Sequence, residues 1–183
     1  AVTAPEITAL NRDPDKLTVM VLTGVTALVR ATAFKMEVEG VTYPAREIGE
    51  LLRSADITHI SNEIPFDPHC PTPNWSQQSL QFCSDPKYIE LLEYVGTDII
   101  ELTGNHFQDR GSAATFFTLD MYDELGIPYY GGGRDLFDAR DLTLIEHNGN
   151  KFAFIGCNPG GPDYAWGRDD GWPGAAPCDY EYM

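Results

Sequence analysis

The order in which apolar runs alternate with helical patterns is what most constrains the fold. Residues 17–22 (LTVMVL) form a β-branched apolar run that ends at a Thr-Gly pair, as expected of a strand buried on both faces. Residues 56–63 (DITHISNE) and 98–104 (DIIELTG) have the same character. Strands that alternate with helices usually pair in parallel. The sequence therefore predicts a layered α/β fold with a mainly parallel sheet.

Helical patterns lie between these runs. Pro44 suits the first position of a helix over residues 44–55. Asp85 is placed to cap a second helix, which Gly96 would end. Residues 111–126 form a third helical pattern that also ends in glycine. Each pattern follows a predicted strand, which supports the α/β class.

The second half predicts a fourth strand at residues 127–133, a short helix at 134–140 and a hairpin at 142–156. The hairpin turn is Asn148-Gly149, a strong type I′ signal. Residues 158–183 are irregular and rich in Gly, Pro and aromatic side chains. We expect residues 1–183 to be a single α/β domain. No evident cover exists in this chain for three apolar residues of the hairpin: Phe152, Phe154 and Ile155. We therefore expect an incomplete domain, which further protein or a partner would complete.

Composition narrows the class of function. The 183 residues include 28 acidic and 12 basic ones, which gives a formal net charge of -16. Such a chain repels a phosphate backbone, so nucleic-acid binding is not expected. No run approaches the roughly 18 apolar residues of a membrane helix, and no charged-then-apolar leader opens the chain. The first residues resemble those of a mature or trimmed N-terminus.

The four cysteines lie in or beside segments rich in Pro, Gly and Asp, and none forms a CxxC pair. A four-cysteine zinc site would need tight pairs. Disulfides need only an oxidising compartment, and we expect Cys70 with Cys83 and Cys157 with Cys178. The alternative is four free thiols in a cytosolic protein.

Polar side chains follow each of the first three predicted strands. The carboxyl ends of parallel strands meet at one edge of a sheet, where α/β proteins bind ligands. We expect these side chains to gather there and to offer oxygen and nitrogen donors to one or two divalent ions. They are Thr26, Asn62, Glu63, Asn105, His106 and Asp109.

At these positions the sequence resembles the CapA-like proteins of poly-γ-glutamate capsule synthesis, a branch of the calcineurin-like metallophosphoesterase superfamily. The family's second strand ends in Asn-Leu-Glu and its third in Asn-His followed by Asp-x-Gly. The matching segments run in the family's order from about Leu17 to Gly156: Asn62-Glu63, Asn105-His106 with Asp109 and Gly111, Gly131–Gly133 with Ala139-Arg140, and the hairpin NGNKFAFIG.

The resemblance implies a metallophosphoesterase-like sandwich. It also implies a divalent metal (Mn, Zn, Mg or Ca) held by Glu63, Asn105 and His106, with His106 as the catalytic group. We expect Asn62, Thr26, Arg30 and Asp109 to bind substrate or shape the site. Two features depart from the family. Its first strand ends in Gly-Asp where this chain has Gly24-Val25, and its later histidine motifs have no counterpart here.

Each site residue also has a structural interpretation. Glu63 could bond loop amides instead of a metal, and His106 could be packed under the next helix. Asp109, before Arg110-Gly111, is well placed to satisfy free amides at a helix start. His59 lies within a strand, where packing is its default role.

The resemblance implies an extracellular or cell-surface protein that handles an anionic or glycan surface polymer such as poly-γ-glutamate, as a metal-dependent hydrolase if the site is active. The alternative is a non-catalytic surface or assembly protein that keeps the fold and has lost the site. Val25 favours that alternative, because neutral Thr26 beside it cannot replace a bridging carboxylate. We expect this chain alone to bind divalent metal weakly or not at all.

Overall fold

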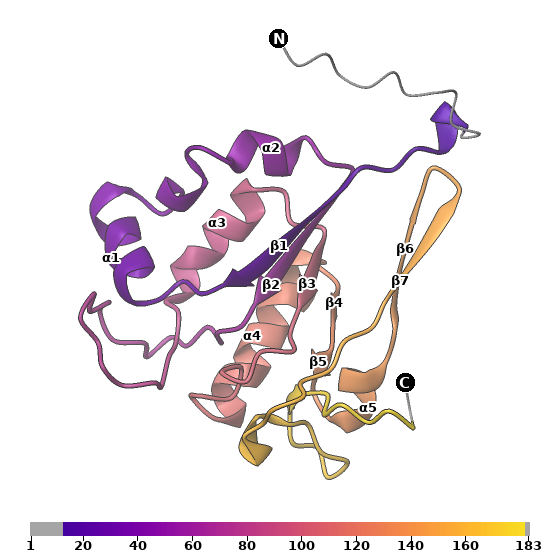
Figure 1. Cartoon of the computed structure of the whole chain (residues 1–183). Coiled ribbons are helices and arrows are strands. Elements are labelled where there is room, and N and C mark those ends of the chain that lie inside the picture. The colour runs from indigo at the N-terminus through magenta and orange to yellow at the C-terminus, as the bar shows by residue number, and fades with distance from the viewer. Residues whose placement is uncertain (1–12, 182–183) are drawn as a thin grey trace.

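The computed structural model describes residues 13–181. The expectations for the first residues, and for the ends of the ranges 1–183 and 158–183, lie outside these residues. The central sheet contains four strands in the order β1-β2-β3-β4, all parallel (Figure 1). The predicted α/β class with a mainly parallel sheet is confirmed. The strands of the central sheet are β1 (Met20–Thr26), β2 (Ile57–Asn62), β3 (Ile99–Glu101) and β4 (Tyr129–Tyr130).

Helices cover one face of this sheet, and an antiparallel hairpin lies beside the other (Figure 1). The helices on that face are α1 (Arg30–Glu39), α2 (Gly49–Arg53), α3 (Ile89–Tyr94) and α4 (Ser112–Leu125). A fifth helix, α5 (Leu136–Arg140), lies beside the short strand β5 (Gly132–Gly133) instead. The hairpin strands are β6 (Thr143–His147) and β7 (Asn150–Phe154). Short 3-10 turns occur at Pro14–Lys16, Tyr43–Ala45, Pro86–Tyr88 and Asp163–Ala165.

Several local predictions are confirmed in detail. The Asp85 side chain accepts from the amide of Lys87 and so caps the turn that leads into α3. Gly126 adopts the left-handed conformation at the end of α4, which glycine enters without a steric cost. Asn148 and Gly149 both have positive φ, 49° and 74°, as a type I′ hairpin turn requires.

Other local predictions are wrong. The predicted helix over residues 44–55 is only a 3-10 turn followed by the short α2, and α1 was not predicted at all. β1 starts later than expected and is not buried on both faces, since Leu22 is 60% exposed. The reason is that β1 lies at the edge of the sheet, a position that its own apolar pattern does not show.

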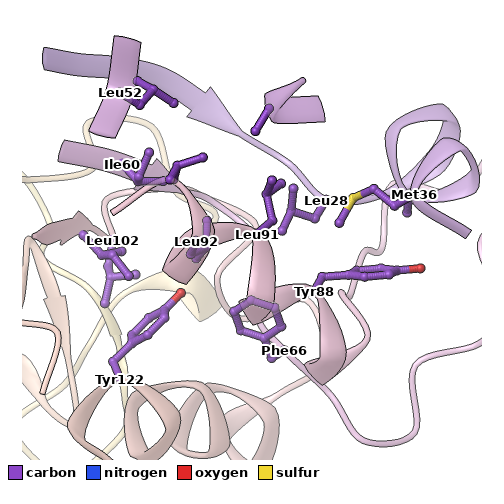
Figure 2. Close-up of a cluster of buried hydrophobic side chains, with 14 of the residues drawn as sticks. Leu28, Met36, Leu52, Ile60, Phe66, Tyr88, Leu91, Leu92, Leu102 and Tyr122 are labelled. Atoms are coloured by element: carbon purple, nitrogen blue, oxygen red, sulfur yellow. The ribbon is translucent and has the colours of Figure 1, made fainter. Parts of the chain in front are cut away.

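The main core lies between the sheet and the helices (Figure 2). Ile60 and Ile100 point into it from β2 and β3, because alternate residues of a strand face opposite sides. Its other labelled members come from the helices and loops: Leu28, Met36, Leu52, Phe66, Tyr88, Leu91, Leu92, Leu102 and Tyr122.

A smaller core fills the hairpin side of the sheet. Phe154 is only 9% exposed and packs with Ile57 and Ile99. Phe152 is partly buried in the same cluster, whereas Ile155 stays exposed. The expectation that all three apolar hairpin residues lack a cover is therefore wrong for the two phenylalanines, because the hairpin folds back onto the sheet.

The C-terminal segment docks against the carboxyl edge of the sheet. Two-residue strands β5 (Gly132–Gly133) and β8 (Gly174–Ala175) pair antiparallel. The Asn158 amide donates to the carbonyl of Thr103, and its oxygen accepts from the indole nitrogen of Trp166. This irregular segment thus supports the loop that follows β3.

Both predicted disulfides are present. Cys70 is bonded to Cys83 and Cys157 to Cys178, with sulfur–sulfur distances of 2.09 and 2.01 Å. The first closes the proline-rich segment between β2 and α3, and the second closes the C-terminal segment. Much of each segment lies outside regular secondary structure. The disulfides therefore restrain segments that have few hydrogen bonds of helices or sheets to hold them in place.

Candidate functional site

The carboxyl ends of β1, β2 and β3 meet at one edge of the sheet, as the parallel topology requires. The segment after β3 is a series of turns that leads into α4 at Ser112. Asn105 and His106 lie in these turns, and both are partly exposed. Glu63 directly follows β2 and is also partly exposed. The edge therefore presents a carboxylate and an imidazole from neighbouring strand ends.

Glu63 lies against the backbone of the turn after β3. A Cβ atom added at Gly104 would come within 2.4 Å of Glu63 Cγ and 2.8 Å of Glu63 Cα. Only glycine permits this approach. The residue that brings the β2 end and the His106 turn together is thus Gly104. Gly104 is the last residue of the predicted third strand, and its sequence position gave no sign of this role.

His106 and Asp109 form a hydrogen-bonded pair. The distance from His106 Nδ1 to Asp109 Oδ2 is 2.7 Å, and the Asp109 side chain is 0% exposed. The same carboxylate oxygen accepts the amide of Phe82 at 2.8 Å. A carboxylate at Nδ1 favours the tautomer that carries its proton there, which leaves Nε2 for chemistry. Asp109 therefore orients the imidazole, in addition to tying two loops together.

Two carboxyl groups at this edge have raised pKa values. Burial raises the pKa of Glu63, and the nearby carboxylates of Asp109 and Glu101 add to the rise, while His106 opposes it. Burial also raises the pKa of Asp109, against the lowering effect of its hydrogen bonds from the Phe82 amide and His106. Perturbed carboxyl groups that gather at a sheet edge are typical of functional sites.

Asn62 is directed into the core. It is 1% exposed, and its Nδ2 donates to the carbonyl of Ile64 at 3.0 Å and to the Tyr122 hydroxyl at 2.6 Å. Asn62 therefore shapes the turn that carries Glu63, and its amide nitrogen is used by the protein itself.

Thr26 and Arg30 flank the edge from the β1 side. Thr26 pairs with Asn62 across the sheet and lines an open apolar groove between β1 and the helices. The Arg30 guanidinium lies over the Phe82 ring, 4.7 Å from its centroid. Phe82 also contacts His106 edge to face, with the two ring centroids 4.9 Å apart. Phe82 thus joins Arg30 to the His106–Asp109 pair, a link with no signal in the sequence.

The donor set does not fit a two-metal centre. Of the expected ligands, Glu63 supplies one carboxylate, Asn105 one neutral amide, and His106 one nitrogen, because Nδ1 is engaged with Asp109. Val25, at the position of the resembling family's aspartate, is 66% exposed and offers no ligand. Within residues 13–181, no three His, Cys, Asp or Glu side chains are grouped to hold a metal ion. Two clustered cations need more charge and more donors than this edge supplies.

Comparisons with known proteins agree with the family resemblance of the sequence. A family model described as bacterial capsule synthesis protein PGA_cap matches residues 18–177. The capsule biosynthesis protein CapA of Bacillus anthracis is 22% identical over 148 residues, which cover 80% of this chain and 36% of that protein. The chain therefore spans about a third of the length of that relative. In the part that the structure describes, no helix is long and apolar enough to cross a bilayer. Because the family model matches most of its length, the chain belongs to the bacterial capsule synthesis protein family PGA_cap.

Proposed function

We propose that this chain is part of an extracytoplasmic capsule-synthesis protein that takes part in the synthesis, export or processing of an acidic surface polymer such as poly-γ-glutamate. Family membership and the name of the Bacillus relative support the link to capsule synthesis. The two disulfides support an oxidising location. The observation that carries the proposal is the oriented His106–Asp109 pair beside Glu63 at the carboxyl edge of the sheet.

The chemistry assigned to these residues is proton transfer at a scissile bond. Asp109 holds Nδ1 of His106, so a protonated imidazole can give the proton at Nε2 to a departing oxygen or nitrogen. Glu63 has a raised pKa because of burial and can accept or hold a proton nearby. A divalent cation would contact Glu63, Asn105 and His106. A complete two-metal centre would need ligands beyond residues 13–181.

The second candidate is a non-catalytic surface or assembly protein that keeps the fold. The observation that favours it is the exposed Val25 in place of a bridging carboxylate. On this alternative, Glu63 and His106 serve only the local structure. Self-association of the purified protein without metal, measured by sedimentation, would support it.

The test uses the organism that carries the gene. Glu63→Gln and His106→Gln are introduced separately in the intact gene, and the polymer on the cell surface is quantified after acid hydrolysis. The matched control is Glu50→Gln, at an exposed residue of α2. Loss of polymer in both site variants, with normal protein levels and a normal control, supports the catalytic assignment.

The other outcomes are equally clear. Normal polymer in both site variants but loss on deletion of the gene would favour the structural role. Normal polymer after deletion would contradict the proposed function. Calorimetric titration with manganese, zinc and calcium tests the metal separately. Micromolar binding of two ions, with phosphodiester turnover that Glu63→Ala abolishes, would contradict our expectation of weak binding by this chain.

A further inference from the structure

A cavity of about 230 Å³ lies beside the candidate site, between the start of α1 and the disulfide-closed loop. Arg30 and Arg110 line it, together with the Cys70–Cys83 bridge and the apolar walls of Pro71 and Pro73. The chain has only 12 basic residues against 28 acidic ones. Two arginines that share one cavity in such an acidic protein point to an anionic ligand.

The Arg30 guanidinium has no carboxylate partner among the described residues. Its Nε atom is buried and has no hydrogen-bond partner among the described residues. No Asp or Glu within residues 13–181 lies at ion-pair distance from it, and its guanidinium donates only to the carbonyl of Ser79 at 3.4 Å. A buried donor left unpaired is costly, and no carboxylate of the described residues offsets the charge of this guanidinium.

The other charged groups around the cavity already have partners. Arg110 Nε donates to Asp67 at 3.0 Å, which fixes the guanidinium plane. Asp85 also lines the cavity, but its side chain accepts from the Lys87 amide at 3.0 Å and lies 3.7 Å from the Lys87 ammonium. Asp85, the acidic residue among those that line the cavity, is therefore held by a cation, which reduces its repulsion of an anion.

The backbone at Arg30 favours an anion as well. Arg30 is the first residue of α1, and this ten-residue helix has neither a side-chain cap nor an acidic residue in its first turn. A helix N-terminus with free amides attracts negative charge. Arg30 also has φ of 50°, a conformation that costs energy for a residue with a Cβ and that occurs often at functional sites.

We propose that this cavity binds a carboxylate, which the guanidinium groups of Arg30 and Arg110 receive through charge-assisted hydrogen bonds. The planar fork of arginine matches a carboxylate in two parallel hydrogen bonds. The cavity is larger than a bare ion needs, and its proline walls suit the methylene groups of a short acidic side chain. That the carboxylate belongs to an acidic polymer rests on the proposed function; the carboxylate preference itself does not.

The test measures binding of glutarate to the purified protein by nuclear magnetic resonance titration. Glutaramide serves as the neutral analogue and inorganic phosphate as the competing anion. We expect glutarate to bind with a dissociation constant of about a millimolar, as for a small ligand with few contacts. Glutaramide should not bind. Absence of glutarate binding, or tighter binding of phosphate than of glutarate, would overturn the proposal.

Variants locate the site. Arg30→Gln and Arg110→Gln should each weaken glutarate binding by about tenfold or more, because each removes charge-assisted hydrogen bonds. Arg46→Gln, at an exposed arginine outside the cavity, is the matched control and should bind as the parent does. Equal affinity in all three variants would overturn the proposal.

Arg30→Gly guards against loss of the fold. Glycine adopts φ of 50° without strain, so this variant should stay folded while it loses glutarate binding. Retained binding in a folded Arg30→Gly protein would contradict the role of the guanidinium.

A short γ-linked glutamate oligomer tests the link to the polymer separately. Binding of the oligomer that depends on Arg30 supports both proposals. Binding of glutarate without binding of the oligomer would keep the carboxylate site and contradict its use for poly-γ-glutamate.

Discussion

The helix-covered core and the carboxyl edge of the sheet treat buried groups in opposite ways. The core collects apolar side chains such as Leu92, Ile100 and Leu119, which are at most 1% exposed. At the edge, atoms of Arg30, Gln108 and Asp109 are buried without a hydrogen-bond partner in residues 13–181. Burial without compensation lowers stability. The core therefore stabilises the fold, whereas the edge contains groups that reduce the stability of the fold, as functional sites commonly do.

The largest expected effect is in the core. Leu92→Ala should lower the free energy of unfolding by about 3 kcal/mol, because it removes a fully buried side chain and leaves a cavity. The matched control is Leu51→Ala, at a leucine that is 61% exposed, with an effect of about 0.5 kcal/mol or less. Urea unfolding measures both. Equal losses would mean that the core does not carry the stability assigned to it.

Covalent closure should matter nearly as much at the edge. The bond between Cys70 and Cys83 spans 13 residues, and the paired change Cys70→Ala with Cys83→Ala should cost about 2 to 3 kcal/mol. Many of the enclosed residues are exposed, so packing cannot replace the bond. Thermal unfolding of the oxidised and substituted proteins compares them. An unchanged melting temperature would show that the loop is held by contacts instead.

Gly104→Ala tests the close approach of the two strand ends. The new Cβ would collide with the backbone of Glu63, and relief by backbone movement should cost about 2 kcal/mol. Gly111→Ala is not a suitable control, because Gly111 has φ of 75°. Gly24→Ala is suitable, since a Cβ there meets nothing within 4 Å. Equal stability of the parent and Gly104→Ala would mean that Glu63 does not lie against this turn.

The smallest expected effect is that of Glu63→Gln, which should raise the free energy of unfolding at pH 7 instead of lowering it. Burial raises the pKa of Glu63 in the folded protein, so the contribution of this group to stability is present below its unfolded pKa of about 4.3 and is lost as pH rises through the folded value. Glu63→Gln carries no such penalty. It should be more stable than the parent at pH 7, by less than about 1 kcal/mol, with the difference gone below about pH 4.

Unfolding in urea at several pH values measures this difference. Glu50→Gln, at an exposed carboxylate of α2, is the matched control. If Glu63→Gln is less stable than the parent at pH 7, the Glu63 carboxylate does not reduce the stability of the folded protein, which contradicts this prediction.

Sequence patterns predicted the order of the secondary-structure elements better than the burial of their side chains. The order of strands, the caps at Asp85 and Gly126, and the turn at Asn148 follow from local chemistry, and all are confirmed. The helix α1 was missed, and its first residue, Arg30, has positive φ. Edge position exposed Leu22, and the folded-back hairpin covered Phe154. These depend on contacts between distant segments, for which a local pattern carries no signal.

From the sequence alone we could predict the α/β class and the strand ends at which polar residues gather, because both follow from periodicity along the chain. The pairing of the four cysteines was an expectation with free thiols as its alternative, and the structure has both bonds. Only the tertiary structure decided which groups at that edge are joined. Asp109 orients His106, Gly104 admits Glu63, and Phe82 contacts both Arg30 and the imidazole. The physical reason is that burial and hydrogen-bond geometry arise where loops from different strands meet, and residue order does not specify their distances.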